Sequence, residues 1–416
     1  MEPANGAVDL DAQKTKKLVV IFDQPMSDRA WSFCGGGPGF PPFKGKPRWD
    51  TPKKIVVDVE LEPDHEYSFS LNCPSATNFQ SGKGVPLEPV AWTFATAPAK
   101  LPSAARQKAG NEQALDQLKS MLPERYSYFD RRVSDWSALY EAHEGAILAA
   151  RTTRGWATAV AKMLAMAEDL HLFLRLGEQT FATSARAIDP HYRAKLLPRY
   201  VPVSPAGKHG LVGRTDDGLG YVMIAAWSDP TEIDAIETAL ASLRDCKALV
   251  VDVRPNSGGD ELLARRVAAW FVEGTKVYAK NRSREKAGPD GFGATLERAL
   301  TGNTEPARQL AQPIALLTSR YVMSSNESFV LMMRQARDCT VVGERTYGSS
   351  GNPKPLELSN GVTIFVPSWQ DLRLDGTCFE GEGIAPDIEV VADAKDFEDS
   401  DPILDRALAL LRSKVR

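Results

Sequence analysis

The stretch that decides the fold is PIALLTSRYVMSSNESFVLMMRQARDCTVVGERTYGSSG, residues 313–351. It opens with an apolar strand at 314–317 and continues into a polar turn at 324–327. A helix rich in Phe, Leu and Met follows, and then a second apolar strand that ends at Gly343. A serine at a strand-to-helix junction lies where backbone amides are unpaired and the helix dipole is positive. Because both features stabilise an oxyanion, this turn is where a nucleophile is expected.

The composition is that of an ordinary globular protein. At 416 residues the chain is long enough for two or three domains. Its net charge of −4 and isoelectric point near 5.9 argue against nucleic acid or an anionic membrane as the main partner. No run approaches the roughly 18 apolar residues of a transmembrane segment. The sequence favours no particular oligomer.

The cysteines and histidines give no sign of a metal site. The five cysteines form no CxxC pair, and no two histidines have metal-ligand spacing, so we expect neither a metal nor another cofactor. Cys34 and Cys73 both lie in the first hundred residues and could form one disulfide in an exported protein. The alternative is five separate thiols, mostly buried.

The N-terminus is polar and has no apolar segment of the kind found in signal peptides. Strand-like sequence begins by Leu18, as it would in a chain trimmed of its export signal. We therefore expect a periplasmic or extracellular protein if such a signal was removed, and a cytoplasmic one otherwise.

The sequence pattern divides the chain into four parts. Residues 1–98 are predicted to form an all-β sandwich of immunoglobulin size, because β-branched and aromatic runs alternate with Gly/Pro/Asp-rich turns. Residues 99–108 have the composition of a linker. Residues 109–177 contain amphipathic helical segments, and Ser134 is the predicted N-cap of one of them. Residues 178–416 alternate strands and helices, which predicts an α/β core with a C-terminal helix.

A second segment with candidate chemistry is ALVVDVRPNSGGDE, residues 248–261, a buried strand that ends in a turn containing Gly258 and Gly259. Paired glycines allow a backbone to approach a ligand closely and to point amides at it. The sequence lacks the lysine and hydroxyl residue of a phosphate-binding loop, so the turn does not indicate a nucleotide site.

Two further segments contain titratable residues at element boundaries. EDLHLFLRLG, residues 168–177, puts His171 between a helix and an apolar strand. FEGEGIAPDIEV, which starts at Phe379, offers Glu380 and Glu382 just before a Gly-Ile-Ala-Pro-Asp turn. Taken alone, each of these residues is more typical of a structural or surface position than of a catalytic one.

Together the four segments occur in the order, and at about the spacing, of the peptidase family that contains the C-terminal processing (tail-specific) proteases. The resemblance covers roughly residues 110–395 and is specific at VDVRPNSGG, SSNE, VVGERTYGSSG and GEGIAPD. It implies a crotonase-like (ClpP/crotonase) core and a serine peptidase that cleaves polypeptides through an acyl-enzyme. The PANGAVDLD and FDQPM runs of the predicted sandwich resemble immunoglobulin-like modules at the front of many bacterial exported proteins.

The resemblance also implies roles for residues in the serine turn. Matched to the family's Ser-x-Ser-x-Ser-Glu motif, Glu327 takes the acidic position, and the nucleophile falls on Ser324. The oxyanion hole would then consist of the amide of Ser325 and one amide from Gly258 or Gly259.

The general base departs from the main branch of the family. That branch has a lysine in a Gly-Lys-Gly loop, and Ser349 stands at the equivalent position, where a serine cannot act as the base. Lys354 is close in sequence but is a poor substitute. The tricorn-type branch uses a histidine ahead of the core, and this position corresponds to His171, whose pKa near neutrality would suit proton transfer. That branch also places a serine just before its histidine. Leu170 stands here, so this contact is missing or comes from elsewhere.

In the same branch a glutamate near the Gly-x-x-Pro-Asp turn supports the histidine. Glu380 occupies that position, in the manner of a triad's third member, and Glu382 is the rival assignment. The family's inserted PDZ domain is not expected, because only about forty residues separate the strand after His171 from the strand at Tyr221.

The predicted function is therefore a serine peptidase that acts on polypeptides without a metal or cofactor. One alternative is a catalytically inactive family member that binds peptides or apolar ligands, because the same core resembles a retinoid-binding protein of the eye. Another is an acyl-CoA enzyme of the crotonase type, which shares the architecture and the oxyanion hole but does not need Ser324.

Overall fold

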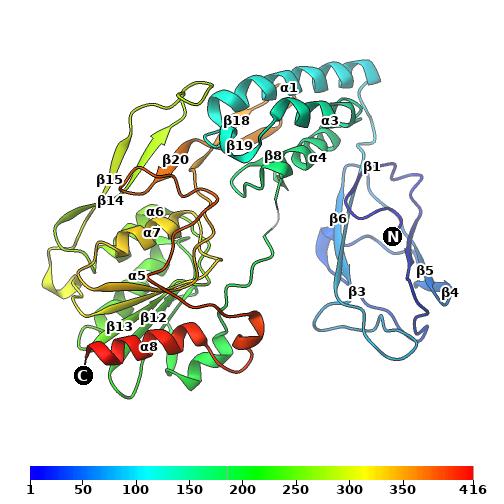
Figure 1. Cartoon of the computed structure of the whole chain (residues 1–416). Coiled ribbons are helices and arrows are strands. Elements are labelled where there is room, and N and C mark those ends of the chain that lie inside the picture. The colour runs from blue at the N-terminus through cyan, green and yellow to red at the C-terminus, as the bar shows by residue number, and fades with distance from the viewer. Residues whose placement is uncertain (185, 416) are drawn as a thin grey trace.

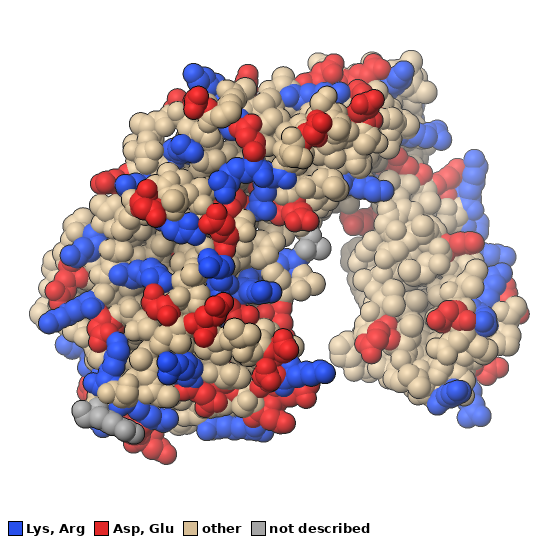
Figure 2. Space-filling view, in the orientation of Figure 1, with Lys and Arg blue, Asp and Glu red and all other residues tan. Residues whose placement is uncertain are grey.

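The computed structural model describes residues 1–184 and 186–415. Figure 1 shows three parts, which we call the β module (β1 to β7), the helical lobe (α1 to α4 with β8, β9, β18 and β19) and the α/β core (the remaining elements). In Figure 2 the β module stands apart from the α/β core. Its contacts with the lobe include an ion pair of 3.1 Å between Arg154 of α4 and Asp64.

The β module consists of two small sheets that enclose an aromatic core. One sheet has the order β1-β7-β6-β3 and the other β2-β5-β4. Phe79 and Trp92 are fully buried between the sheets, with Phe69 and Phe94 packed around them. The assignment of this module to the immunoglobulin-like class stays a prediction. The strands are β1 (Ala7–Leu10), β2 (Lys17–Ile21), β3 (Phe33–Cys34), β4 (Arg48–Thr51), β5 (Lys54–Asp58), β6 (Glu66–Leu71) and β7 (Val90–Thr96).

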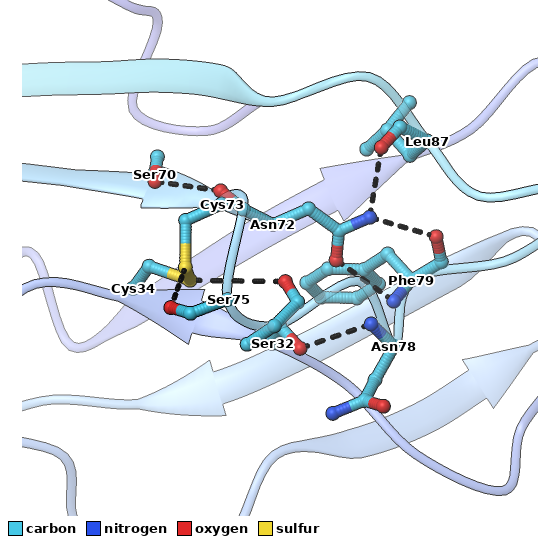
Figure 3. The surroundings of a disulfide bond; sticks show 10 residues. Ser32, Cys34, Ser70, Asn72, Cys73, Ser75, Asn78, Phe79 and Leu87 are labelled. Atoms are coloured by element: carbon cyan, nitrogen blue, oxygen red, sulfur yellow. Dashed lines mark hydrogen bonds between the residues drawn. A yellow bond between two sulfur atoms is a disulfide. The ribbon is translucent and has the colours of Figure 1, made fainter. Parts of the chain in front are cut away.

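Cys34 and Cys73 form a disulfide, which settles the choice that the sequence left open. The bond joins β3 to the loop that follows β6, as Figure 3 shows. Beside it, the buried side-chain amide of Asn72 donates to the backbone oxygens of Phe79 and Leu87 at 2.9 and 2.8 Å. The disulfide and these hydrogen bonds together hold the long connection between β6 and β7.

The helical lobe packs its helices against a four-stranded sheet of order β18-β19-β8-β9. Its first helix begins at Ala104, inside the segment predicted as a linker, because the Ser103 side chain accepts a hydrogen bond from the Arg106 amide and caps it. The lobe elements are α1 (Ala104–Arg125), α2 (Phe129–Arg132), α3 (Trp136–Leu148), α4 (Thr153–Leu164), β8 (Phe173–Leu176), β9 (Gln179–Ala182), β18 (Pro353–Glu357) and β19 (Thr363–Pro367).

Two features of the lobe differ from the sequence-based expectation. Ser134 does not cap α3. Asp135, one residue later, lies directly before the helix, and its carboxylate accepts from the Ala138 amide at 2.9 Å. In addition, β18 and β19 fall in the range predicted for the α/β core, yet they pair with β8. The chain therefore crosses from the core back to the lobe between Gly343 and Pro353.

The α/β core is built on a seven-stranded sheet of order β10-β11-β12-β13-β16-β17-β21. From β12 to β21 all neighbours are parallel. Helices α5, α6 and α7 cover one face and α8 covers the other. The sheet strands are β10 (Val203–Pro205), β11 (Gly210–Arg214), β12 (Leu219–Ile224), β13 (Ala248–Asp252), β16 (Ile314–Thr318), β17 (Cys339–Gly343) and β21 (Ile388–Glu389). The helices are α5 (Pro230–Ser242), α6 (Glu261–Ala268), α7 (Ser325–Met333) and α8 (Pro402–Lys414).

A small sheet of order β15-β14-β20 completes the core, with β14 (Thr275–Ser283), β15 (Leu296–Thr301) and β20 (Trp369–Leu372). The predicted multidomain organisation with an α/β core is thus present, while the absence of a PDZ domain stays a prediction. None of the described helices is long and apolar enough to cross a membrane.

The parallel strands bring two of the candidate segments together. β13 and β16 are direct neighbours, so their carboxyl ends meet at one edge of the sheet. The glycine turn at 258–259 follows the first strand, and the serine turn at 324–327 follows the second. The crossing segment after β17 passes beside this edge, because the Ser349 backbone oxygen accepts from the Ser324 amide at 2.8 Å.

Candidate active site

Ser324 is the last residue before α7 and has an unusual backbone conformation. Its φ of 56° and ψ of −132° lie in a region that glycine adopts readily and other residues avoid. Its amide donates to the Ser349 oxygen and to the Glu327 carboxylate, the latter at 3.2 Å. These two contacts hold the backbone in this conformation and direct the hydroxyl away from the helix, towards the lobe.

His171 reaches Ser324 from the helical lobe. It lies between α4 and β8, is 9% exposed, and has its Nε2 atom 3.1 Å from the Ser324 Oγ. Its Nδ1 atom is 3.0 Å from the Ser349 Oγ. Burial lowers the pKa of the imidazole, so the neutral form that can accept a proton predominates at neutral pH.

Two contacts of His171 were not foreseen from the sequence. The Ser349 hydroxyl, at the position where the main branch has a lysine, supplies the serine contact that Leu170 cannot make. Asp169 accepts from the His171 amide at 2.9 Å and from the Tyr126 hydroxyl at 2.7 Å, and so fixes the backbone that carries the imidazole. The only sequence signal for Asp169 is its position two residues before the histidine.

Glu327 ties the serine turn to the crossing segment. Its buried carboxylate accepts from the Thr346 hydroxyl at 2.5 Å and from the amides of Gly348 and Ser349 at 2.8 and 3.0 Å, in addition to the Ser324 amide. Burial raises its pKa to about 7, against these donors, which lower it. One carboxylate thus positions both serines that contact the imidazole.

The candidate oxyanion hole contains two amides that donate to no acceptor among the described residues, those of Ser325 and Gly259. The Gly258 amide is occupied, because it donates to the Asn256 side-chain oxygen at 2.8 Å. Gly258 has another role: a Cβ atom there would lie 2.9 Å from the Ser324 Cβ, so only glycine permits this close approach.

Glu380 is buried near the site but does not contact His171. Its carboxylate pairs with Arg132 at 2.5 Å and accepts from the Ser350 amide at 2.8 Å. Burial raises its pKa and the guanidinium opposes that change. Glu382, the rival, has 59% of its side chain exposed and lies 3.5 Å from an arginine on the surface. Lys354 is exposed on β18 and does not contact the imidazole.

The site thus joins three regions of the chain that are distant in sequence. The lobe supplies His171 and Arg132, the α/β core supplies Ser324 and the amides, and the crossing segment supplies Ser349. An imidazole that is uncharged, hydrogen-bonded on both nitrogens and next to a serine hydroxyl can remove the proton of that hydroxyl. Free amides beside the same serine can stabilise an oxyanion.

Residues 218–390 match the model of peptidase family S41. Carboxyl-terminal-processing peptidase 3, chloroplastic, of Arabidopsis thaliana is 25% identical over 214 residues, which are 48% of this chain and 38% of that protein. Carboxy-terminal processing protease CtpA of Bacillus subtilis is 23% identical over 180 residues, 42% of this chain and 35% of that protein. The chain therefore spans less than two thirds of the length of these curated relatives.

Among solved structures, a protein from Parabacteroides merdae described as a candidate peptidase is 25% identical, with a TM-score of 0.64. The similarity covers 73% of this chain and 96% of that one. These comparisons agree with the resemblance seen in the sequence. The family match includes Ser324, Gly259 and Glu380, whereas His171 lies outside it.

Proposed function

Because residues 218–390 belong to peptidase family S41, we propose that this protein is a serine peptidase with Ser324 as nucleophile and His171 as general base. The observation that carries the proposal is the distance of 3.1 Å between the Nε2 atom of His171 and the Ser324 Oγ. A hydrogen bond of this length allows the proton to move as the oxygen attacks. Polypeptides are the proposed substrates.

In the proposed reaction Ser324 Oγ attacks the carbonyl carbon of a peptide bond while His171 Nε2 takes its proton. The negative charge that develops on the carbonyl oxygen is stabilised by the amides of Ser325 and Gly259. Collapse of the tetrahedral intermediate breaks the C–N bond, and His171 returns the proton to the leaving amine. Water, activated by the same imidazole, then hydrolyses the acyl-enzyme.

Ser349 and Glu380 act as positioning residues in this proposal. When Nε2 accepts the serine proton, Nδ1 must carry a hydrogen, and the Ser349 Oγ at 3.0 Å is its acceptor. Glu380 acts one step further out, because it holds the Ser350 amide and thereby the segment that carries Ser349. This arrangement replaces the carboxylate of a Ser-His-Asp triad by a hydroxyl supported from behind.

The disulfide between Cys34 and Cys73 supports a compartment with oxidising conditions, such as the periplasm or the cell exterior. Disulfides form and persist there and are rare in the bacterial cytosol. We therefore propose that the protein works outside the cytoplasm, in agreement with the resemblance of its β module to modules of exported proteins.

A fluorophosphonate probe, which reacts with activated serines, tests the catalytic proposal. The wild-type protein should be labelled, and both Ser324→Ala and His171→Ala should lose at least about 10³-fold in labelling rate. Two matched controls, Ser81→Ala in the β module and His143→Ala on α3, should keep the wild-type rate. Labelling that persists in Ser324→Ala would mean another serine is the nucleophile. A folded wild type that is not labelled would favour an inactive binding protein.

A further inference from the structure

Arg186 is a half-buried arginine in the segment that leads from β9 to the α/β core. Its guanidinium donates to the backbone oxygen of Tyr321. The Cζ atom lies 4.1 Å from the centre of the Tyr321 ring and 5.0 Å from the centre of the Tyr347 ring. The two aromatic rings hold the cation in place but do not use its remaining N–H donors.

The two tyrosines flank the candidate active site. Tyr321 lies in the loop that leads to Ser324, and Tyr347 lies in the crossing segment beside Glu327. Burial chiefly, and the positive charge of Arg186 in addition, lower the pKa of His171, so the guanidinium is within electrostatic range of the imidazole. Arg186 is thus attached to the two loops that carry the contacts of the proposed base.

Arg186 differs from other arginines near the site because it has no carboxylate partner among the described residues. The others are paired: Arg132 with Glu380, Arg254 with Asp252 and Asp401, and Arg298 with Asp371. The Nε atom of Arg186 is buried without an acceptor. Glu327 is close enough to affect the pKa of Arg186, but its oxygens accept from other donors.

A hollow of about 720 Å³ begins next to this arginine. Its lining includes Ala187 and Ile188, which follow Arg186 in sequence, and Thr346 and Tyr347 of the crossing segment. An extended peptide placed in this hollow would pass the guanidinium as it reaches the reacting serine. Half-buried N–H donors in a fork are suited to a planar anion, since a carboxylate can accept two parallel hydrogen bonds from one guanidinium.

We propose that Arg186 binds a carboxylate of the polypeptide substrate, and this inference rests on the proposed peptidase function. The carboxylate has two sources, the free C-terminus of the substrate or an Asp or Glu side chain, and the chemistry of recognition is the same for both. A hydrogen-bonded charge pair at a half-buried position should improve binding by about tenfold or more over a neutral peptide.

The test measures how well peptides protect Ser324 from the fluorophosphonate probe. Three N-acetylated apolar hexapeptides are compared: one with a free C-terminal carboxylate, the same peptide as the C-terminal amide, and an amide with one internal Glu. Protection is measured for the wild type, Arg186→Met, Arg186→Lys and the control Arg308→Met. Arg308 also stacks on an aromatic ring, that of Trp270, and is half-exposed. The ratio of half-protecting concentrations within each variant is independent of its basal labelling rate.

In the wild type and in Arg308→Met, one of the two acidic peptides should protect at a concentration about tenfold lower than the neutral amide. Which acidic peptide does so identifies the source of the carboxylate. The ratio should fall to about one in Arg186→Met and stay intermediate in Arg186→Lys. Equal protection by all three peptides in a wild type that is labelled normally would overturn the inference and leave the catalytic proposal standing. A preference that survives in Arg186→Met would also overturn it. A folded wild type that is not labelled would overturn both.

Discussion

Replacing Ser349 by alanine tests whether a hydroxyl, rather than a carboxylate, orients the proposed base. The substitution removes the atom that lies 3.0 Å from the Nδ1 of His171, in a place where the serine is fully buried. An imidazole N–H left without an acceptor in such surroundings is less stable by about 1–3 kcal/mol. The productive tautomer loses this amount, so the rate of acylation should fall by roughly 10- to 100-fold, since about 1.4 kcal/mol corresponds to a factor of ten.

The assay is the rate of fluorophosphonate labelling at neutral pH, measured beside thermal unfolding of the same sample. Ser81→Ala is the matched control, because it also removes a buried hydroxyl, one that accepts from the Val85 amide in the β module. It should keep the labelling rate. A Ser349→Ala protein that is folded and labelled as fast as the wild type would refute the reasoning, and Asp169 or another group would then have to orient the ring.

Three other results are expected. The labelling rate of the wild type should rise with pH and level off, with a midpoint below 6.5, because burial lowers the pKa of His171 and only the neutral imidazole accepts a proton. In urea denaturation, Glu380→Gln should lower the free energy of unfolding by about 3–5 kcal/mol, because it leaves a buried arginine unpaired, whereas the exposed Glu382→Gln should change it by less than about 1 kcal/mol. Reduction of the Cys34–Cys73 disulfide, with a sequence separation of 39, should destabilise the β module by about 4 kcal/mol in a thermal scan and leave labelling of the active-site serine unchanged.

The sequence predicted the strand, turn and helix around Ser324 well, because an apolar run followed by hydroxyl and amide side chains is a strong local signal. The pairing of Ser324 with His171 followed from motif order and agrees with their contact in the structure. Helix boundaries were less predictable. Ser134 and Asp135 are both good capping residues, and only the path of the backbone decides which one precedes the helix.

The contact between His171 and Ser349 could not be predicted from local pattern. It depends on the chain crossing from β17 to β18, where the backbone of the crossing segment is fixed by Glu327. The sequence showed which residue stands in place of a lysine, but not that its hydroxyl would turn to the imidazole. Arg186 was missed for a related reason, since its aromatic partners come from two loops that are far from it in sequence.

The backbone of Ser324 sets the stability of the protein against its chemistry. A residue with a side chain held at φ 56° and ψ −132° is less stable by about 1–3 kcal/mol than it would be in an ordinary conformation, and glycine largely avoids this penalty. Ser324→Gly should therefore unfold at a higher temperature than Ser324→Ala, although both lack the nucleophile. At this one position the most stable version of the fold is a protein without the hydroxyl, so selection for folding alone would replace the serine.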